Sequence, residues 1–299
     1  MSEAALEPVT APARRRRPWH AYATGIARRS PTFAIGFCAV LFFLFLAVFA
    51  EAIAPFNPTK TFPYEILQPP GQRFLFGSDG NGMDVLSRVI HGSRYAFGIA
   101  VPVGLIILAI GVPLGIVAGY KGGLIDEILL RLLDILRAFP TIILALAVVA
   151  AVGQSLTSMV LVIGILDSPM FARVVRAEVL ALRESTFVKA ALAIGNPPWR
   201  IMLVHILPNA ILGATAQLPM RMAWAVRISA TLSFIGVGIQ APTPEWGAMI
   251  RQGAEYAITG QWWVALFPGL ALMGLVLGFN LLGDALSDML DPRRRAAGK

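Results

Sequence analysis

The sequence ARVVRAEVLALRESTFVKAALAIGNPPWRIMLVHILPN, residues 172–209, is a polar insert between two segments that are apolar enough to lie in lipid. Its first half repeats apolar residues at the i, i+3, i+4, i+7 spacing of one helix face, namely Phe187, Ala190, Ala191 and Ile194. Gly195 is expected to end this helix, and Pro198 to open another. In the second helix the same spacing returns at Trp199, Met202, Leu203 and Ile206. The stretch therefore predicts two short amphipathic helices, joined at a glycine and held at a membrane surface as a docking element.

Composition places the whole chain in a membrane. Of its 299 residues, 57% are hydrophobic and 14% are charged, and the mean hydropathy is +0.70. Soluble domains carry about 25% charged residues, so we expect an all-α, polytopic membrane protein. The single cysteine, Cys38, excludes an internal disulfide and a thiolate metal cluster. We find no nucleotide-binding loop, catalytic triad spacing or metal-ligand cluster, which predicts no catalytic, cofactor or metal site in this chain.

Six membrane spans are expected from the apolar runs: 33–54, 95–120, 138–153, 157–175, 208–238 and 262–282. Gly153, Gln154 and Ser155 separate the third run from the fourth. The predicted organisation is a basic N-terminal tail (1–32), one six-span domain (33–283) and a C-terminal tail (284–299). A cleaved signal peptide is an alternative for the first span, but its apolar run exceeds the 7–15 residues usual in such a segment.

The basic residues indicate which side of the membrane each segment occupies. With both termini inside, the inner segments hold 18 of the 25 lysines and arginines, and the outer segments hold five. This is the bias of the positive-inside rule, so we read the net charge of +8 as orientation rather than affinity for nucleic acid. The prediction is a multi-pass protein of a bacterial cytoplasmic membrane, in contact with lipid, with the docking insert in the cytoplasm.

Two further motifs fall on the predicted outer side. Residues 77–94 (GSDGNGMDVLSRVIHGSR) begin with a turn-rich, acidic segment, and Asp84 is placed to cap the helix that follows. Residues 232–238 (LSFIGVG) close the fifth span, and 242–247 (PTPEWG) come shortly after it.

These motifs resemble those of the permeases of ABC importers. Residues 189–195 (KAALAIG) followed by 206–208 (ILP) are similar to the E-A-A-x-x-x-G and I-x-L-P pattern of their cytoplasmic coupling loop. The outer motifs are similar to those of the dipeptide/oligopeptide/nickel branch, and to the shorter of its two permease subunits. The resemblance covers about residues 30–295.

The resemblance implies a type I importer fold of six spans with a coupling helix in the loop 183–206. It also implies a second permease subunit as a heterodimer partner, two ATPase subunits or domains that bind ATP and Mg, and an extracytoplasmic solute-binding protein. The implied function is half of a pathway for peptides or similar small solutes, opened by alternating access. Residues implied at the ATPase contact are Glu184, Phe187, Lys189, Ala190, Ala191, Gly195 and Arg200. Residues implied in outer docking are Asp79, Asp84, Glu245 and Trp246.

Some positions depart from the family pattern. Lys189 stands where a glutamate is usual, which puts a salt bridge to the ATPase at that position in doubt. Ser229 likewise replaces a common glutamate, and Arg227 appears two residues earlier. A charge within a span is a functional-site hypothesis by default. The candidate pathway residues are Asp167, Arg221, Arg227 and Ser229. Either arginine could hold a substrate carboxylate or pair with an acid of the partner, and Asp167 could form a salt bridge within the bundle.

Three alternatives remain open. Within the family, the substrate could be nickel or a metal chelate, although the chain has only three histidines. A stand-alone secondary transporter would need intramembrane acids and a broken-helix repeat, and only Asp167 qualifies. An intramembrane enzyme would need paired catalytic residues at bilayer depth, whereas all three histidines fall near or outside the interfaces.

Overall fold

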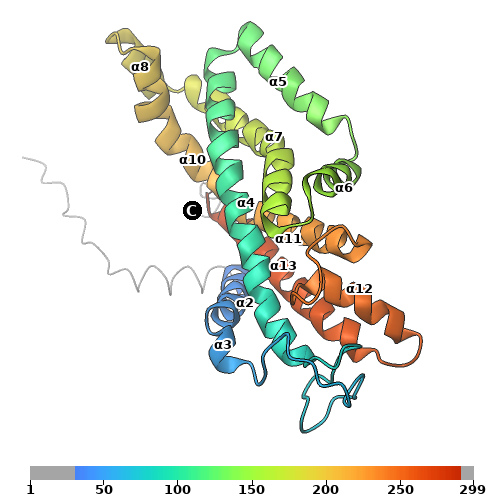
Figure 1. Cartoon of the computed structure of the whole chain (residues 1–299). Coiled ribbons are helices and arrows are strands. Elements are labelled where there is room, and N and C mark those ends of the chain that lie inside the picture. Colours follow the sequence, from blue (N-terminus) through green and yellow to red (C-terminus); the bar gives the residue numbers. More distant parts are fainter. Residues whose placement is uncertain (1–30, 291–299) are drawn as a thin grey trace, which may run out of the picture.

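The computed structural model describes residues 31–290, and regular structure in that range is helical apart from an isolated bridge between Ser78 and Asp84. Figure 1 shows the helices as an elongated bundle. Residues 1–30 of the predicted N-terminal tail and residues 291–299 of the predicted C-terminal tail lie outside the described part. The all-α prediction is confirmed for the described residues.

Four helices are long and apolar enough to cross a membrane, namely α2 (Pro31–Val48), α4 (Val85–Lys121), α7 (Leu156–Arg183) and α13 (Trp263–Leu290). Two bent pairs supply further spans. Helix α5 (Gly123–Arg137) meets α6 (Thr141–Val152) at 77°, and the segment Pro198–Thr215 meets α11 (Leu218–Ile235) at 51°. The chain is therefore a multi-pass membrane protein, and its predicted six spans are reached when each bent pair counts as one.

Helix α4 extends beyond the predicted apolar span at its start. The helix begins at Val85, ten residues before the apolar run 95–120 that was predicted as the span, and Asp84 caps it by accepting a hydrogen bond from the Ser87 N–H at 2.8 Å. The predicted N-cap is thereby confirmed. Polar side chains of the added turns, including Ser87, Arg88 and Ser93, are buried. Hydropathy detects only the apolar part of this helix, because the partners of its polar start come from distant segments.

The third span also differs from its prediction. Residues 121–137 were expected as an inner connection, but Gly123–Arg137 forms the amphipathic helix α5. Helix α6 has only 12 residues and would rise about 18 Å, which is short of the roughly 30 Å of a bilayer core. Helix α6 alone is therefore too short to span the membrane, and only the bent pair α5–α6 passes as one candidate span.

The fifth span is broken within its predicted limits of 208–238. Helix α10 (Leu207–Thr215) is followed by a short turn, after which α11 begins at Leu218. Pro219 lies in the first turn of α11. A proline has no N–H to donate to the carbonyl four residues earlier, which here belongs to Thr215. The loss of that bond accounts for the bend at this point.

Helices α4 and α7 form the central contact of the bundle (Figure 1). Gly111, Gly115 and Gly119 recur every fourth residue on the α4 face that meets α7. A Cβ added at Gly115 would lie 2.6 Å from the Ala172 carbonyl oxygen, and one at Gly119 would lie 2.8 Å from Val179 Cβ. Small residues at this spacing let the two helices approach closely.

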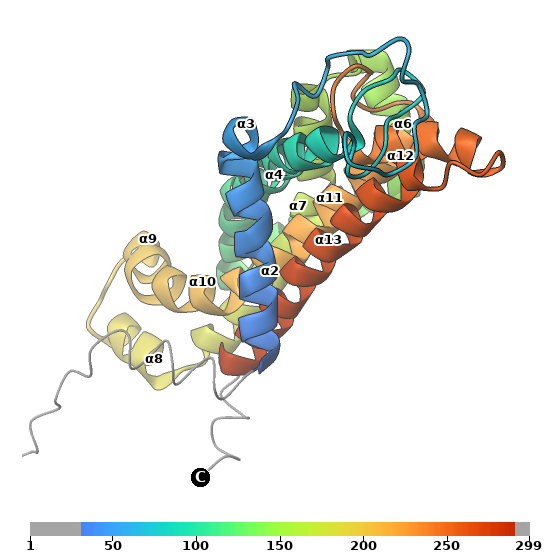
Figure 2. The ribbon, with the colours of Figure 1, turned by 90° about the horizontal axis from the view of Figure 1, so that it is seen from below.

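The two ends of the bundle carry different elements. Figures 1 and 2 place α8 (Thr186–Ala193) and α10 at one end, and the loop 54–84 with α12 (Trp246–Ala257) at the opposite end. We call them the α8 end and the α12 end. Helix α12 lies in the segment 240–261, where no helix was predicted.

Candidate functional site

The two short helices predicted within residues 172–209 lie at the α8 end. Helix α8 ends at Ala193, and Gly195 follows with a φ of +79°, a left-handed conformation that favours glycine. Pro198 then starts α9 (Pro198–Arg200), which continues into a π-helical turn, Ile201–Ile206, and then into α10. The prediction of two helices joined at Gly195 is confirmed, while the π-helical turn was not expected.

Helix α8 has one buried face and one exposed apolar face. Val188 is 0% exposed and Ala191 is 5% exposed, and both join the buried cluster around α4 and α7. Phe187 and Ile194 are 42% and 80% exposed, and Ala190 is also exposed. The predicted apolar stripe is therefore divided, with Ala191 directed inward and the other three residues directed outward.

The second helix of the element is divided in the same way. Ile201 and Ile206 are fully buried, while Trp199, Leu203 and Val204 are 54–59% exposed. In a π-helix, residues five apart share a face, so Ile201 and Ile206 are both directed into the core. The prediction had placed Ile206 on the same face as Trp199, because it assumed α-helical spacing throughout.

Two of the charged residues of this element, Lys189 and Glu184, form an ion pair with each other. The Lys189 Nζ lies 3.2 Å from the Glu184 Oε2, and both side chains are largely exposed. Lys189, the departure from the family pattern, therefore has an acidic partner within its own loop. Arg200 is exposed beside Trp199. The α8 end thus presents apolar side chains next to a small number of charges.

At the α12 end, the residues predicted for docking are all buried. Asp79, Asp84, Glu245 and Trp246 are between 1% and 5% exposed. Buried side chains cannot touch a docked protein directly, so they can only hold the surrounding surface in shape. Docking at this end stays a prediction, and any contact would be made by the residues that cover these four.

Arg88 connects three segments of the α12 end. Its Nε lies 3.4 Å from the Asp79 Oδ2, and its Nη1 donates to the carbonyl oxygens of Pro58 at 3.1 Å and Pro242 at 3.0 Å. We call Arg88, Asp79 and these two carbonyls the Arg88 clamp. It fastens the loop after α3 (Ala50–Ile53) and the loop before α12 to the start of α4.

Two tryptophans strengthen the same end. Trp246 Nε1 donates to the Val89 carbonyl at 3.0 Å, and Trp263 Nε1 donates to the Ser78 carbonyl at 3.1 Å. Glu245 caps α12 by accepting hydrogen bonds from the backbone N–H groups of Gly247 at 3.0 Å and Ala248 at 2.8 Å. Burial raises the pKa of the Glu245 carboxyl, and these hydrogen bonds act in the opposite direction.

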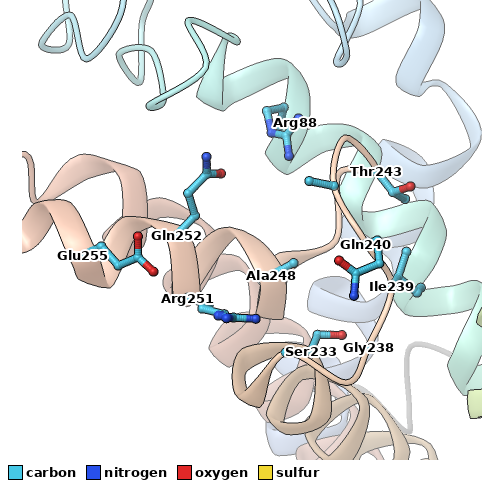
Figure 3. A pocket seen from close by; sticks show the side chains of 12 residues that line it. Arg88, Ser233, Gly238, Ile239, Gln240, Thr243, Ala248, Arg251, Gln252 and Glu255 are labelled. Carbon is cyan, nitrogen blue, oxygen red and sulfur yellow. The ribbon is translucent and has the colours of Figure 1, made fainter. Parts of the chain in front are cut away.

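Arg88 also lines a polar pocket of about 200 Å³ (Figure 3). It is formed by the loop after α11 and by one face of α12, and its exposed charged residues are Arg251 and Glu255. The Ser233 hydroxyl is buried at its base and has no hydrogen-bond partner among the described residues. Sequence reasoning did not single out Arg251 or Glu255, because neither belongs to a recognisable motif.

The four candidate pathway residues do not form one cluster. Asp167 of α7 and Arg221 of α11 form an ion pair at 3.2 Å beside a hollow of about 160 Å³. Ser229 is 1% exposed, and its hydroxyl has no hydrogen-bond partner in the range 31–290. Arg227 is exposed on the same helix. Arg137 and Thr141, on either side of the α5–α6 bend, also line the hollow. Sequence reasoning missed Arg137 because it placed this residue in an inner loop.

Within residues 31–290, no group of three or more histidine, cysteine or acidic side chains is placed to hold a metal ion. The candidate features of this chain are a partly exposed apolar surface at the α8 end, a buried polar network at the α12 end, and the ion pair between Asp167 and Arg221.

Comparison with known proteins identifies the family. Residues 111–296 match the binding-protein-dependent transport system inner membrane component family, and residues 23–70 match the N-terminal TM domain of oligopeptide transport permease C. The dipeptide transport system permease protein DppC of Alkalihalophilus pseudofirmus is 38% identical over 262 residues, covering 88% of this chain and 86% of that protein.

Two glutathione transport system permease proteins, both GsiD, are similarly related. That of Pectobacterium atrosepticum is 36% identical over 282 residues, covering 94% of this chain and 93% of its own. That of Escherichia coli is 39% identical over 288 residues, covering 96% and 94%. The family resemblance seen in the motifs is confirmed, and this chain belongs to the family of inner membrane components of binding-protein-dependent transport systems.

Proposed function

We propose that this chain is a permease subunit of an ATP-driven importer of short peptides and forms half of the translocation pathway. Relatives that it matches over most of their length are named as permeases of dipeptide, di/tripeptide and glutathione transport systems. Their names describe transport subunits rather than enzymes, so ATP binding and hydrolysis fall to partner subunits. The nature of the transported peptide is carried by these names and not by any single residue.

The observation that carries the mechanism is the divided surface of the α8 end. Phe187, Ile194 and Trp199 are exposed there, although the same element is anchored inward by Val188 and Ile201. Exposed apolar side chains gathered beside charges are typical of a protein contact. We assign this face to the groove of an ATPase partner, so that closure of the ATPases on ATP moves α8.

Movement of α8 would reach the spans through its buried face. Val188 and Ala191 pack in the same cluster as Ile201, Ile206 and the central residues of α4 and α7. A packed cluster transmits displacement instead of absorbing it. Alternating access would follow if this displacement changes the angles between the spans. Such a change would disturb the fewest helical hydrogen bonds at the bends before α6 and α11, where the helices are already broken.

The remaining partners follow from the same mechanism. A second permease subunit would complete the pathway, and a solute-binding protein would deliver the peptide at the α12 end. The exposed rim of the polar pocket, with Arg251 and Glu255, is the part of that end that is available for contact. In this proposal the α8 end lies in the cytoplasm of a bacterium and both termini lie on that side of the cytoplasmic membrane.

The coupling assignment is tested by Ala190→Asp in the complete transport complex. A charge in the middle of the exposed face of α8 should release the ATPases from the permease, and uptake should fall at least tenfold with insertion unaffected. The matched control is Ala254→Asp, at an exposed alanine of α12 at the opposite end, which should retain the ATPases. Unchanged uptake and ATPase retention in Ala190→Asp would refute the assignment.

The orientation is tested separately with single-cysteine reporters in a Cys38→Ala background. Reporters at Thr61 and Gln252 should react with an impermeant thiol reagent from outside, and one at Thr186 only after the membrane is opened. The reverse pattern would place the α8 end outside and rule out its contact with ATPases.

A further inference from the structure

The ion pair between Asp167 and Arg221 uses only part of its hydrogen-bonding capacity. Arg221 Nη1 meets Asp167 Oδ1 at 3.2 Å, and the two side chains are 18% and 5% exposed. The other carboxylate oxygen, Oδ2, and the guanidinium Nε are both buried, and neither has a hydrogen-bond partner in the part of the chain described. Buried polar atoms in native proteins are nearly always paired, so this arrangement calls for a further polar group.

Room for such a group exists beside the pair. A hollow of about 160 Å³ is lined by Asp167 and Arg221, with Arg137 and Thr141 from the α5–α6 bend and Trp224 and Met170 on its apolar side. Arg137 is exposed and forms no ion pair with any residue between 31 and 290. Helices α6, α7 and α11 meet at this point, as Figure 1 shows.

The charges and free atoms define what the hollow can bind. Two guanidinium groups and one carboxylate leave a net positive charge, which favours an anion, and the planar fork of arginine matches a carboxylate. The free Oδ2 of Asp167 requires a donor close to that anion. A carboxylate with an adjacent N–H is the chemistry of the last residue of a peptide chain.

We propose that this hollow binds the C-terminal residue of the transported peptide. Its carboxylate is held by Arg137 and by the Nε of Arg221, its backbone N–H donates to the Asp167 Oδ2, and its side chain lies against Trp224 and Met170. The inference rests on the proposed function. Sites for whole small-molecule ligands usually have about 300–1,000 Å³, so the hollow suits one terminal residue and leaves the rest of the peptide in the pathway.

The test compares a tripeptide that has a free C-terminal carboxylate with the same tripeptide as a C-terminal amide. Both are supplied with the same solute-binding protein to the complete complex in proteoliposomes, and kcat/KM for uptake is measured for each. Arg137→Gln should lower the value for the free acid about tenfold and leave the amide nearly unchanged. Because the binding protein is the same in every assay, a change in the acid-to-amide ratio between variants belongs to the permease.

The matched control is Arg131→Gln. Arg131 lies on the same helix, but it pairs with Glu127 and does not line the hollow, so its loss should leave the ratio unchanged. Arg137→Lys, which keeps the charge, should preserve part of the ratio. An unaltered ratio in Arg137→Gln, or an equal change in Arg131→Gln, would overturn the proposal. A wild-type complex that transports neither peptide would instead refute the proposed function.

A second measurement covers the case in which Arg137→Gln fails to assemble. Met170 lines the hollow and is 36% exposed, so Met170→Cys in a Cys38→Ala background places a thiol there. The free-acid tripeptide should slow alkylation of this thiol several-fold, and the amide should not. Equal protection by both peptides would show that the carboxylate is not what the hollow recognises.

Discussion

Trp246 and Trp199 lie at opposite ends of the molecule, and one is buried while the other is exposed. Trp246 is 2% exposed, and its indole N–H donates to the Val89 carbonyl at 3.0 Å. Trp199 is 59% exposed and follows a proline turn at the edge of the α8 end. The same contrast holds for their surroundings. Buried charges at the α12 end are paired or cap a helix, whereas several large apolar side chains at the α8 end are exposed.

The difference separates a surface that the chain completes by itself from one that it leaves open. The α12 end compensates its buried charges internally, through the Arg88 clamp and the caps at Asp84 and Glu245. The α8 end keeps its inward face packed and its outward face unpaired. In a family whose members act within binding-protein-dependent transport systems, the open surface is where we expect a partner to supply the missing contacts.

The largest expected effect is the removal of Arg88. In Arg88→Met, Asp79 stays buried without its cation and two carbonyl groups lose their donor, which should cost about 3–5 kcal/mol of stability. The thermal midpoint of the purified permease measures it. Arg73→Met is the matched control, because its ion pair with Glu65 is partly exposed and is worth about 0–1 kcal/mol. Equal losses in the two variants would contradict the view that the α12 end depends on its buried network.

Two substitutions at the α8 end, one buried and one exposed, should separate an effect on stability from an effect on partner binding. Val188→Ala removes a buried side chain and should cost about 2 kcal/mol of stability. Ile194→Ala removes one that is 80% exposed, so stability should change by less than about 0.5 kcal/mol while ATPase retention falls. If Ile194→Ala destabilises the isolated permease as much as Val188→Ala does, the exposed face is not an open one.

A smaller effect is expected from Trp246→Phe. The Val89 carbonyl loses its donor, at a cost of about 1 kcal/mol, and the smaller phenyl ring adds a cavity at this buried position. Trp262→Phe is the control, because Trp262 is 51% exposed. Thermal midpoints of both variants check this, and a greater loss in Trp262→Phe would show that the exposed indole of Trp262 contributes more to stability than the buried bond of Trp246.

The smallest effect is expected at Lys189. Its pair with Glu184 is exposed, so Lys189→Gln should change the stability of the permease by less than about 0.5 kcal/mol. Uptake measured over a range of salt concentrations distinguishes a role toward the partner from this local pair. A large drop in the thermal midpoint would mean that the pair is far less solvated than its exposure indicates.

The sequence predicted those features of the site whose cause is local. Gly195 ends α8 because a left-handed residue follows the helix, and Asp84 caps α4 because its carboxylate reaches an N–H three residues away. Neither needs information from elsewhere in the chain. The faces of α8 and of the following π-helical turn were predicted less well, since Ala191 and Ile206 turn inward toward neighbours that the local pattern does not contain.

The order of the apolar segments and the two short helices joined at Gly195 were thus predictable from the sequence alone, because hydropathy and helix breaks are properties of consecutive residues. Only the tertiary structure decided that Asp79 and Trp246 are buried, that Arg88 reaches Pro58 and Pro242, and that Asp167 pairs with Arg221 beside Arg137. These partners lie far apart in the sequence: Pro58 and Pro242 are 30 and 154 residues from Arg88, and Asp167 is 54 residues from Arg221. Burial and charge pairing depend on which helices meet, and that is settled by packing of the whole bundle.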